Sequence, residues 1–328
     1  METAQTVNRE FVPRRGFRGG HLQTLASFFL PRRIAIPPAE KRLIEVEAGV
    51  QVLCHCHWQL NREKALTVII VHGLEGSSES QYMLGIAAKG MAAGMNVVRM
   101  NQRNCGGTDA LSPTLYHSGR SQDIAAVARN LMDQDHISRF ALVGFSMGGN
   151  LVLKLAGEWR KEGPPQFRAV AAVCPSMNLA ASADALHLPA NRIYEYYFMW
   201  QLRARLRMKA RLFPQVFDAS RLRGLTTLRE FDDKITAHYC GFEGASDYYE
   251  RSAAANVIDR IAVPTLILHA ANDPFIRILP ETRQKTLANP NITFVESEDG
   301  GHCSFLAQPD GDDGRWAEQQ VVDFLRAF

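Results

Sequence analysis

Short apolar segments recur along the chain from residue 43 onward, and their spacing predicts β-strands. Residues 43–47 and 50–58 alternate between apolar and polar positions on either side of Gly49, which predicts two strands joined by a tight turn. Residues 66–71 form a continuous apolar, β-branched run, which is typical of a strand buried on both faces. Similar runs predict further strands at residues 96–100, 140–143, 168–174, 265–268 and 292–295.

Segments with helical periodicity separate most of these strands. They lie at residues 81–93, 121–133, 150–159, 280–288 and 316–325. Strands that alternate with helices indicate a mostly parallel sheet covered by helices on both faces. The fold class is therefore predicted as α/β.

The alternation breaks after residue 177, and this break predicts the domain organisation. Residues 178–257 are rich in Arg, Tyr and Phe and contain no clear strand pattern. We expect one domain over residues 41–328, with a helical cap inserted at about 178–257. Residues 1–40 are basic and rich in Gly and Pro, and we expect an N-terminal arm there. The basic stretch 14–18 is either solvated or clasped onto the domain.

Composition and charge exclude several classes of protein. The 37 basic and 34 acidic residues leave a net charge of +3, which is too close to balance to indicate a nucleic-acid-binding protein. The apolar fraction of 46% excludes a disordered chain. The first ten residues are polar, no run of 18 apolar residues occurs, and the six cysteines are scattered. We therefore expect a cytoplasmic protein with reduced thiols.

One short string carries the sharpest chemical signal. Gly144-Phe-Ser-Met-Gly-Gly149 stands between a predicted strand and a predicted helix. This is the G-x-S-x-G pattern in which a serine lies on a strained strand-to-helix turn as a nucleophile. The helix that follows aims free N–H groups at a developing oxyanion. We expect Ser146 to be the nucleophile and the Met147 N–H to be one oxyanion donor.

A second glycine loop follows the third predicted strand. It reads His72-Gly-Leu-Glu-Gly76. In hydrolases with a nucleophile elbow, the loop after this strand supplies the second oxyanion N–H. We assign that N–H to Leu74, and we expect His72 to pack the loop rather than to transfer protons.

The remaining partners of a serine nucleophile should follow along the chain as an acid and then a histidine. Asp273 follows the strand at 265–268, and His302 lies in a glycine loop after the strand at 292–295. Open α/β sheets build their sites at such strand ends. Asp109 and Asp247 are alternative acids outside this position. Cys303 is a candidate accessible thiol beside His302, but Ser146 already fills the nucleophile position.

Longer strings make a family resemblance specific. The chain from about residue 14 onward resembles the α/β-hydrolase superfamily, and within it the YheT-type branch of predicted hydrolases. The resemblance implies that Ser146, Asp273 and His302 form a catalytic triad. The matching strings are GGHLQT from Gly19, HGLEGSS from His72, NQRNCGG from Asn101, GFSMGGN from Gly144, FDD from Phe231, YY from Tyr248, NDP from Asn272 and GH from Gly301.

The combined interpretation is a serine carboxylic ester hydrolase of the α/β-hydrolase fold. It acts on a small-molecule ester, with short- to medium-chain acyl groups, and needs no metal and no organic cofactor. One alternative is an acyltransferase that passes the same acyl group to an alcohol. The branch also contains acyltransferases with a His-x-x-x-x-Asp string, but no histidine here has Asp five residues later. The other alternative is a catalytically silent lipid-binding module.

Two further patterns have ordinary structural explanations. The string Cys54-His-Cys-His57 resembles a metal cluster, but alternation along a strand places the cysteines and histidines on opposite faces. The second pattern is an apolar stripe at 199–213, flanked by Arg203, Arg207 and Arg211. It predicts a cap helix that packs on the core. The alternative is an interfacial helix in weak contact with an anionic membrane surface.

Overall fold

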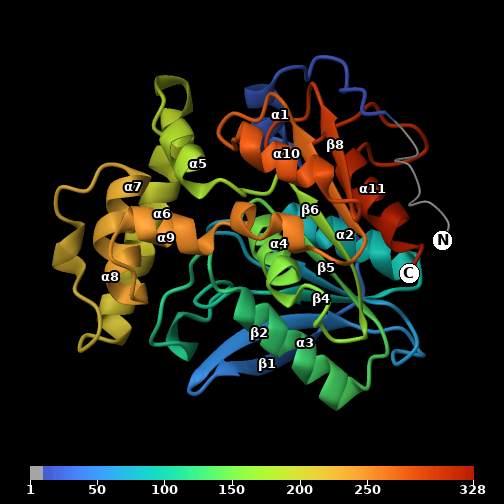
Figure 1. Cartoon of the computed structure of the whole chain (residues 1–328), viewed down its shortest axis with the longest axis horizontal. Helices are drawn as coiled ribbons and strands as arrows, with labels where there is room; N and C mark the ends of the chain where they lie inside the picture. The colour runs from blue at the N-terminus through green and yellow to red at the C-terminus, as the bar shows by residue number, and fades with distance from the viewer. Residues whose placement is uncertain (1–9) are drawn as a thin grey trace.

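Residues 10–328, which the computed structural model describes, contain eight strands in a single sheet (Figure 1). The spatial order is β1-β2-β4-β3-β5-β6-β7-β8. All pairs from β4 to β8 are parallel, and only the β1–β2 hairpin and its contact with β4 are antiparallel. The bounds are β1 Glu40–Glu47, β2 Val50–His57, β3 Thr67–Val71, β4 Asn96–Met100, β5 Phe140–Phe145, β6 Phe167–Val173, β7 Thr265–Ala270 and β8 Ile292–Ser297.

Helices cover both faces of this sheet, as the alternation predicts. Along β3, Val68 and Ile70 face one hydrophobic cluster, while Ile69 and Val71 face the other. Helices α2 and α11 pack on the first face, and α3 and α4 pack on the second. The predicted α/β fold class is therefore confirmed. The bounds are α2 Gln81–Ala92, α3 Ser121–Asp135, α4 Met147–Trp159, α10 Pro280–Ala288 and α11 Trp316–Leu325.

The segment between β6 and β7 is helical and gathers at one end of the molecule, at the left of Figure 1. Within residues 178–257 the structure contains no strand. A hydrophobic cluster of its own holds this cap together and includes Phe275 and Ile276 from the loop after β7. The cap therefore packs directly against the loop that carries Asp273. Its α-helices are α5 Leu179–Leu186, α6 Arg192–Leu212, α7 Leu228–Phe231, α8 Ala237–Cys240 and α9 Ala245–Ser252.

The N-terminal arm is clasped onto the domain from residue 10 onward, and residues 1–9 of the expected arm lie outside the described residues. Phe11 packs edge-on against Phe305 and Trp316, and the Arg14 N–H donates to the Leu306 carbonyl. The arm also contains a helix that the sequence pattern did not predict, α1 Gly20–Phe29. No helix of the described residues is both long and apolar enough to span a bilayer.

Candidate active site

The turn between β5 and α4 holds Ser146 in a strained conformation. Its φ is 55° and its ψ is −118°, in a region that L-residues other than glycine rarely adopt. The flanking glycines are required by space. A Cβ on Gly144 would lie 2.2 Å from the Gly148 carbonyl oxygen, and one on Gly148 would lie 2.2 Å from the Val71 carbonyl oxygen. The G-x-S-x-G string therefore forms the tight turn that it predicts.

Two backbone N–H groups beside Ser146 are available to an oxyanion. Met147 is the first residue of α4, and Leu74 lies in the loop after β3. The neighbouring Gly73 N–H is already donated to the Tyr82 hydroxyl at 3.0 Å. In the described part of the chain, the Leu74 and Met147 N–H groups have no acceptor. Both residues line a cavity with Ser146, which is the arrangement expected of oxyanion donors.

The loops after β7 and β8 bring the predicted acid and histidine together. Asp273 Oδ2 lies 2.8 Å from His302 Nδ1. Its other oxygen, Oδ1, accepts hydrogen bonds from the backbone N–H groups of Phe275 and Ile276 at 3.1 and 2.9 Å. Burial acts to raise the pKa of Asp273, but the His302 charge and the hydrogen bonds with His302 and the Ile276 N–H lower it below its usual range. An ionised Asp273 at this distance favours the tautomer of the neutral imidazole with its proton on Nδ1, which leaves Nε2 as the acceptor of the ring.

Ser146 stands where two cavities meet. The inner cavity, of about 100 Å³, lies under the cap, and the outer cavity, of about 330 Å³, contains His302. Leu74, Ser146, Phe198 and Phe275 line both. Within residues 10–328 no hydrogen bond joins the side chains of Ser146 and His302. The two side chains instead line the same outer cavity.

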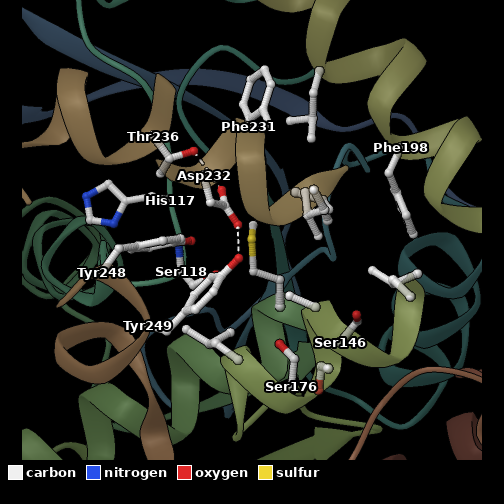
Figure 2. Close-up of a pocket in the computed structure, with 18 of the residues that line it drawn as sticks. His117, Ser118, Ser146, Ser176, Phe198, Phe231, Asp232, Thr236, Tyr248 and Tyr249 are labelled. Carbon is white, nitrogen blue, oxygen red and sulfur yellow. Dashed lines mark hydrogen bonds between the residues drawn. The ribbon is translucent and has the colours of Figure 1, made fainter. Parts of the chain in front are cut away.

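The inner cavity is mostly apolar and has a polar wall away from Ser146 (Figure 2). Asp232 accepts hydrogen bonds there from Tyr249 at 2.7 Å and from Thr236 at 2.8 Å. Burial raises the pKa of Asp232 to about 6, although both hydrogen bonds act in the opposite direction. The Tyr248 hydroxyl accepts from the Ser118 N–H. The FDD and YY strings therefore meet in the wall of this cavity.

The N-terminal helix α1 braces the histidine loop, a role that the sequence pattern did not indicate. The His302 N–H donates to Thr24 Oγ1 at 2.8 Å, and a Cβ on Gly301 would lie 2.5 Å from the Gly20 carbonyl oxygen. On the other side, a Cβ on Gly20 would lie 1.9 Å from the carbonyl oxygen of Asn272, next to Asp273. The GGHLQT string is the sequence signal that could have indicated this contact, because its glycines permit the close approach.

Two cysteines also approach the histidine. Cys303 Sγ lies 3.8 Å from His302 Nε2, and the Cys303 N–H donates to Cys174 Sγ at 3.4 Å. Burial acts to raise the pKa of the Cys303 thiol, but the hydrogen bond with Cys174 and the His302 charge lower it below its ordinary value. Two thiols and an imidazole are donors that Zn²⁺ accepts. A metal held there would occupy the Nε2 side that a base needs.

The alternative acids are engaged elsewhere. Asp109 accepts from Arg205 at 3.1 Å, and Asp247 accepts from Arg251 at 3.0 Å and from a backbone N–H in the cap. His72 is fully buried. Its Nδ1–H donates to the Gly73 carbonyl, and its Nε2 accepts from the Gln102 N–H. Burial lowers the pKa of His72 to about 4, which suits the loop-packing role expected of it.

The Cys54-His-Cys-His57 string lies on β2 and divides between its two faces. Cys54 and Cys56 belong to a hydrophobic cluster on one face of the sheet. His57 Nε2 accepts from Arg99, and His55 lies 3.0 Å from Glu79. The four side chains therefore do not converge.

Comparison with known proteins shows the family to which the chain belongs. A family model described as the alpha/beta hydrolase fold matches residues 67–309, and the chain belongs to this family. Along almost its whole length the chain is similar to "Putative esterase YheT" of Escherichia coli (strain K12), at 32% identity over 97% of this chain and 94% of that protein. The predicted YheT-type branch is thereby confirmed.

Other relatives are more distant. "Phospholipase ABHD3" of Mus musculus is 27% identical over 90% of this chain and 72% of its own length. "Monoacylglycerol lipase ABHD2" of Homo sapiens is 23% identical over 100% of this chain and 82% of its own length. Among solved structures, the Pyrobaculum calidifontis esterase superimposes with a TM-score of 0.59 at 17% identity, over 93% of this chain and 88% of that one. That likeness shows the fold alone.

Proposed function

We propose that the protein is a serine carboxylic ester hydrolase. The observation that carries the proposal is the 2.8 Å hydrogen bond from His302 Nδ1 to Asp273, beside a cavity that Ser146 also lines. His302 Nε2 takes the proton of the Ser146 hydroxyl as its oxygen attacks the ester carbonyl. The Leu74 and Met147 N–H groups bind the resulting oxyanion. The relatives described as an esterase, a phospholipase and a lipase support ester chemistry.

The two cavities determine which way the ester lies across Ser146. His302 has to protonate the leaving alcohol, so the alcohol lies on its side, in the outer cavity. The acyl group then occupies the inner cavity, which Leu74 and Met147 line and His302 does not. Water takes the place of the alcohol, and His302 activates it to hydrolyse the acyl-enzyme. Added ethanol tests the acyltransferase alternative, because transfer would yield the ethyl ester in place of the free acid.

A series of p-nitrophenyl esters tests the acyl assignment. Each methylene that enters the apolar inner cavity contributes about 0.8 kcal/mol. We expect kcat/KM to rise several-fold per two-carbon step from acetate, to peak at medium chains and then to fall. Acetate as the best substrate would replace this proposal with a small-ester hydrolase, and no turnover of any ester would remove the enzymatic proposal altogether.

A matched pair of variants on α5 locates the acyl group. Ala183 is buried and lines the inner cavity, whereas Ala180 is exposed on the same helix. Ala183→Phe should move the optimum to shorter chains because the ring fills the cavity. Ala180→Phe should leave the optimum where the wild type has it. An optimum that moves in both variants, or in neither, would place the acyl chain outside the inner cavity.

The pH dependence should report the ionisation of His302. Burial acts to lower the pKa of His302, but the charges of Cys303 and Asp273 raise it above its ordinary value. The imidazole is a base only when neutral, so kcat/KM should rise with pH, with a midpoint above about 6.5. Cys303→Ala removes one of the two charges and should move the midpoint to lower pH. A rate that does not change across this titration would contradict the base assignment.

A further inference from the structure

The long cap helix α6 leaves large apolar side chains exposed to solvent. Ile193, Tyr196 and Trp200 are 64%, 73% and 61% exposed. Their spacing of three and four residues puts them on one face of the helix. The predicted stripe lies on another face, where Met199, Leu202 and Leu206 are buried in the cap cluster. The stripe therefore holds the cap together. The face that carries Ile193, Tyr196 and Trp200 has no packing partner within residues 10–328.

The charge on the exposed surface of α6 has one sign. Arg192, Arg207 and Arg211 are exposed along the helix, and of these Arg192 lies 3.2 Å from Glu195 in an ion pair. Its only acid, Glu195, is buried and accepts a hydrogen bond from the Leu228 N–H at 3.0 Å. The exposed surface of α6 therefore combines aromatic side chains with arginines and carries no carboxylate.

This surface borders the outer cavity. Tyr197, Phe198 and Gln201 of α6 line one side of the cavity, and Thr24 and Ser27 of α1 line the other. The two helices touch directly, because His21 Nδ1 lies 3.0 Å from the Tyr194 hydroxyl and the two rings stack. Helix α1 adds its own exposed apolar side chains, Leu22 and Phe29, at 43% and 78%. Exposed apolar groups thus stand on both helices that flank the route to Ser146.

We propose that the α6 surface, formed by Ile193, Tyr196, Trp200, Arg207 and Arg211, docks on an anionic phospholipid bilayer. Tyrosine and tryptophan favour the membrane–water interface, and arginines are attracted to lipid phosphates. The absence of a carboxylate on this surface favours an anionic surface over a zwitterionic one. The benefit to the enzyme rests on the proposed function, since a docked cap would open the alcohol-side cavity toward lipid esters. The binding itself does not depend on catalysis.

Co-sedimentation with lipid vesicles tests the proposal, using the full chain with Ser146→Ala so that no lipid is consumed. We expect binding to vesicles of phosphatidylcholine mixed with phosphatidylglycerol and little binding to phosphatidylcholine alone. Tyr196→Ser with Trp200→Ser should lower the partition coefficient by about ten-fold or more. Arg207→Gln with Arg211→Gln should lower it about five-fold per arginine, which corresponds to about 1 kcal/mol each.

The control variant is Leu287→Ser, which removes an equally exposed apolar side chain on α10, 63% exposed. It should bind vesicles as the parent does. Equal binding to both vesicle types, or equal loss in the control, would overturn the proposal. A concentration-dependent dimer that the Tyr196→Ser, Trp200→Ser variant abolishes would also overturn it and assign the surface to a second copy of the chain. Turnover of soluble esters, measured with the enzyme that keeps Ser146, tests the proposed function separately.

Discussion

Replacing Ser146 with alanine is expected to abolish ester hydrolysis and labelling by a fluorophosphonate probe. The variant keeps the oxyanion N–H groups of Leu74 and Met147 and both cavities, but it has no oxygen that can form the acyl-enzyme. Removing the nucleophile of a serine hydrolase costs on the order of 10⁶-fold in kcat. Alanine also fits the strained turn, so its unfolding curve should stay close to that of the wild type.

The control for this variant is a second serine in the inner cavity. The Ser176 hydroxyl is buried and has no hydrogen-bond partner among the described residues (Figure 2). Ser176→Ala should still form the covalent adduct with the probe, whatever its effect on acyl binding. Adduct formation by Ser146→Ala, with loss of the adduct in Ser176→Ala, would move the nucleophile to Ser176. Near-wild-type turnover by Ser146→Ala would remove the proposed mechanism.

Most of the sheet could be predicted from the sequence because its signals are local. Strand β4 and helices α10 and α11 have the predicted bounds, and β3 differs by one residue. Buried strands are continuous apolar runs, and the segments between them have helical periodicity. Helix α4, however, begins at Met147 and not at residue 150. Gly148 and Gly149 weaken the helical pattern there. Gly148 is required by the close approach of the Val71 backbone, and a Cβ on Gly149 would lie 3.0 Å from the Pro175 side chain.

Helix α1 could not be predicted because distant contacts define it. The glycines at the start of this segment argue against a helix, since glycine disfavours helical structure. In the structure Gly20 packs on Asn272, and Gln23 exchanges hydrogen bonds with the backbone of Leu306, 283 residues away. Contacts of that kind are invisible to any local pattern. The GGHLQT string indicated that the segment mattered, but gave no geometry.

The pairing of Asp273 with His302 was predictable from the sequence, and the surroundings of this pair were not. Strand ends of a parallel sheet meet at one edge, which is why Asp273 and His302 could be paired from their positions alone. Cys174 and Cys303, which approach each other, both have a positive φ, 44° and 58°, and no sequence pattern indicates either angle. The α6 stripe identified the buried face of the helix correctly, but the exposed face had to be seen in the structure.

The second large effect is expected from Asp273→Asn. Asparagine can keep the hydrogen bonds that Oδ1 accepts from the Phe275 and Ile276 N–H groups, so the loop after β7 should hold its shape. Its amide would instead present an N–H donor to His302 Nδ1, which favours the tautomer with the proton on Nε2. Nε2 could then no longer accept the Ser146 proton. The precedent for this change in serine proteases is a loss of about 10⁴-fold in kcat.

The rival acids supply the controls for this prediction. Asp247→Asn changes an acid that is bonded to Arg251 in the cap. It should lower kcat less than about three-fold, because surface substitutions away from a site usually have small effects. Asp273→Asn should also lower the pH midpoint of the residual activity, because the carboxylate charge that raises the His302 pKa is gone. A purely structural role would reduce stability without moving that midpoint. If Asp247→Asn caused the larger loss, the acid would have to be reassigned, since only a group bonded to the imidazole can change both its tautomer and its titration.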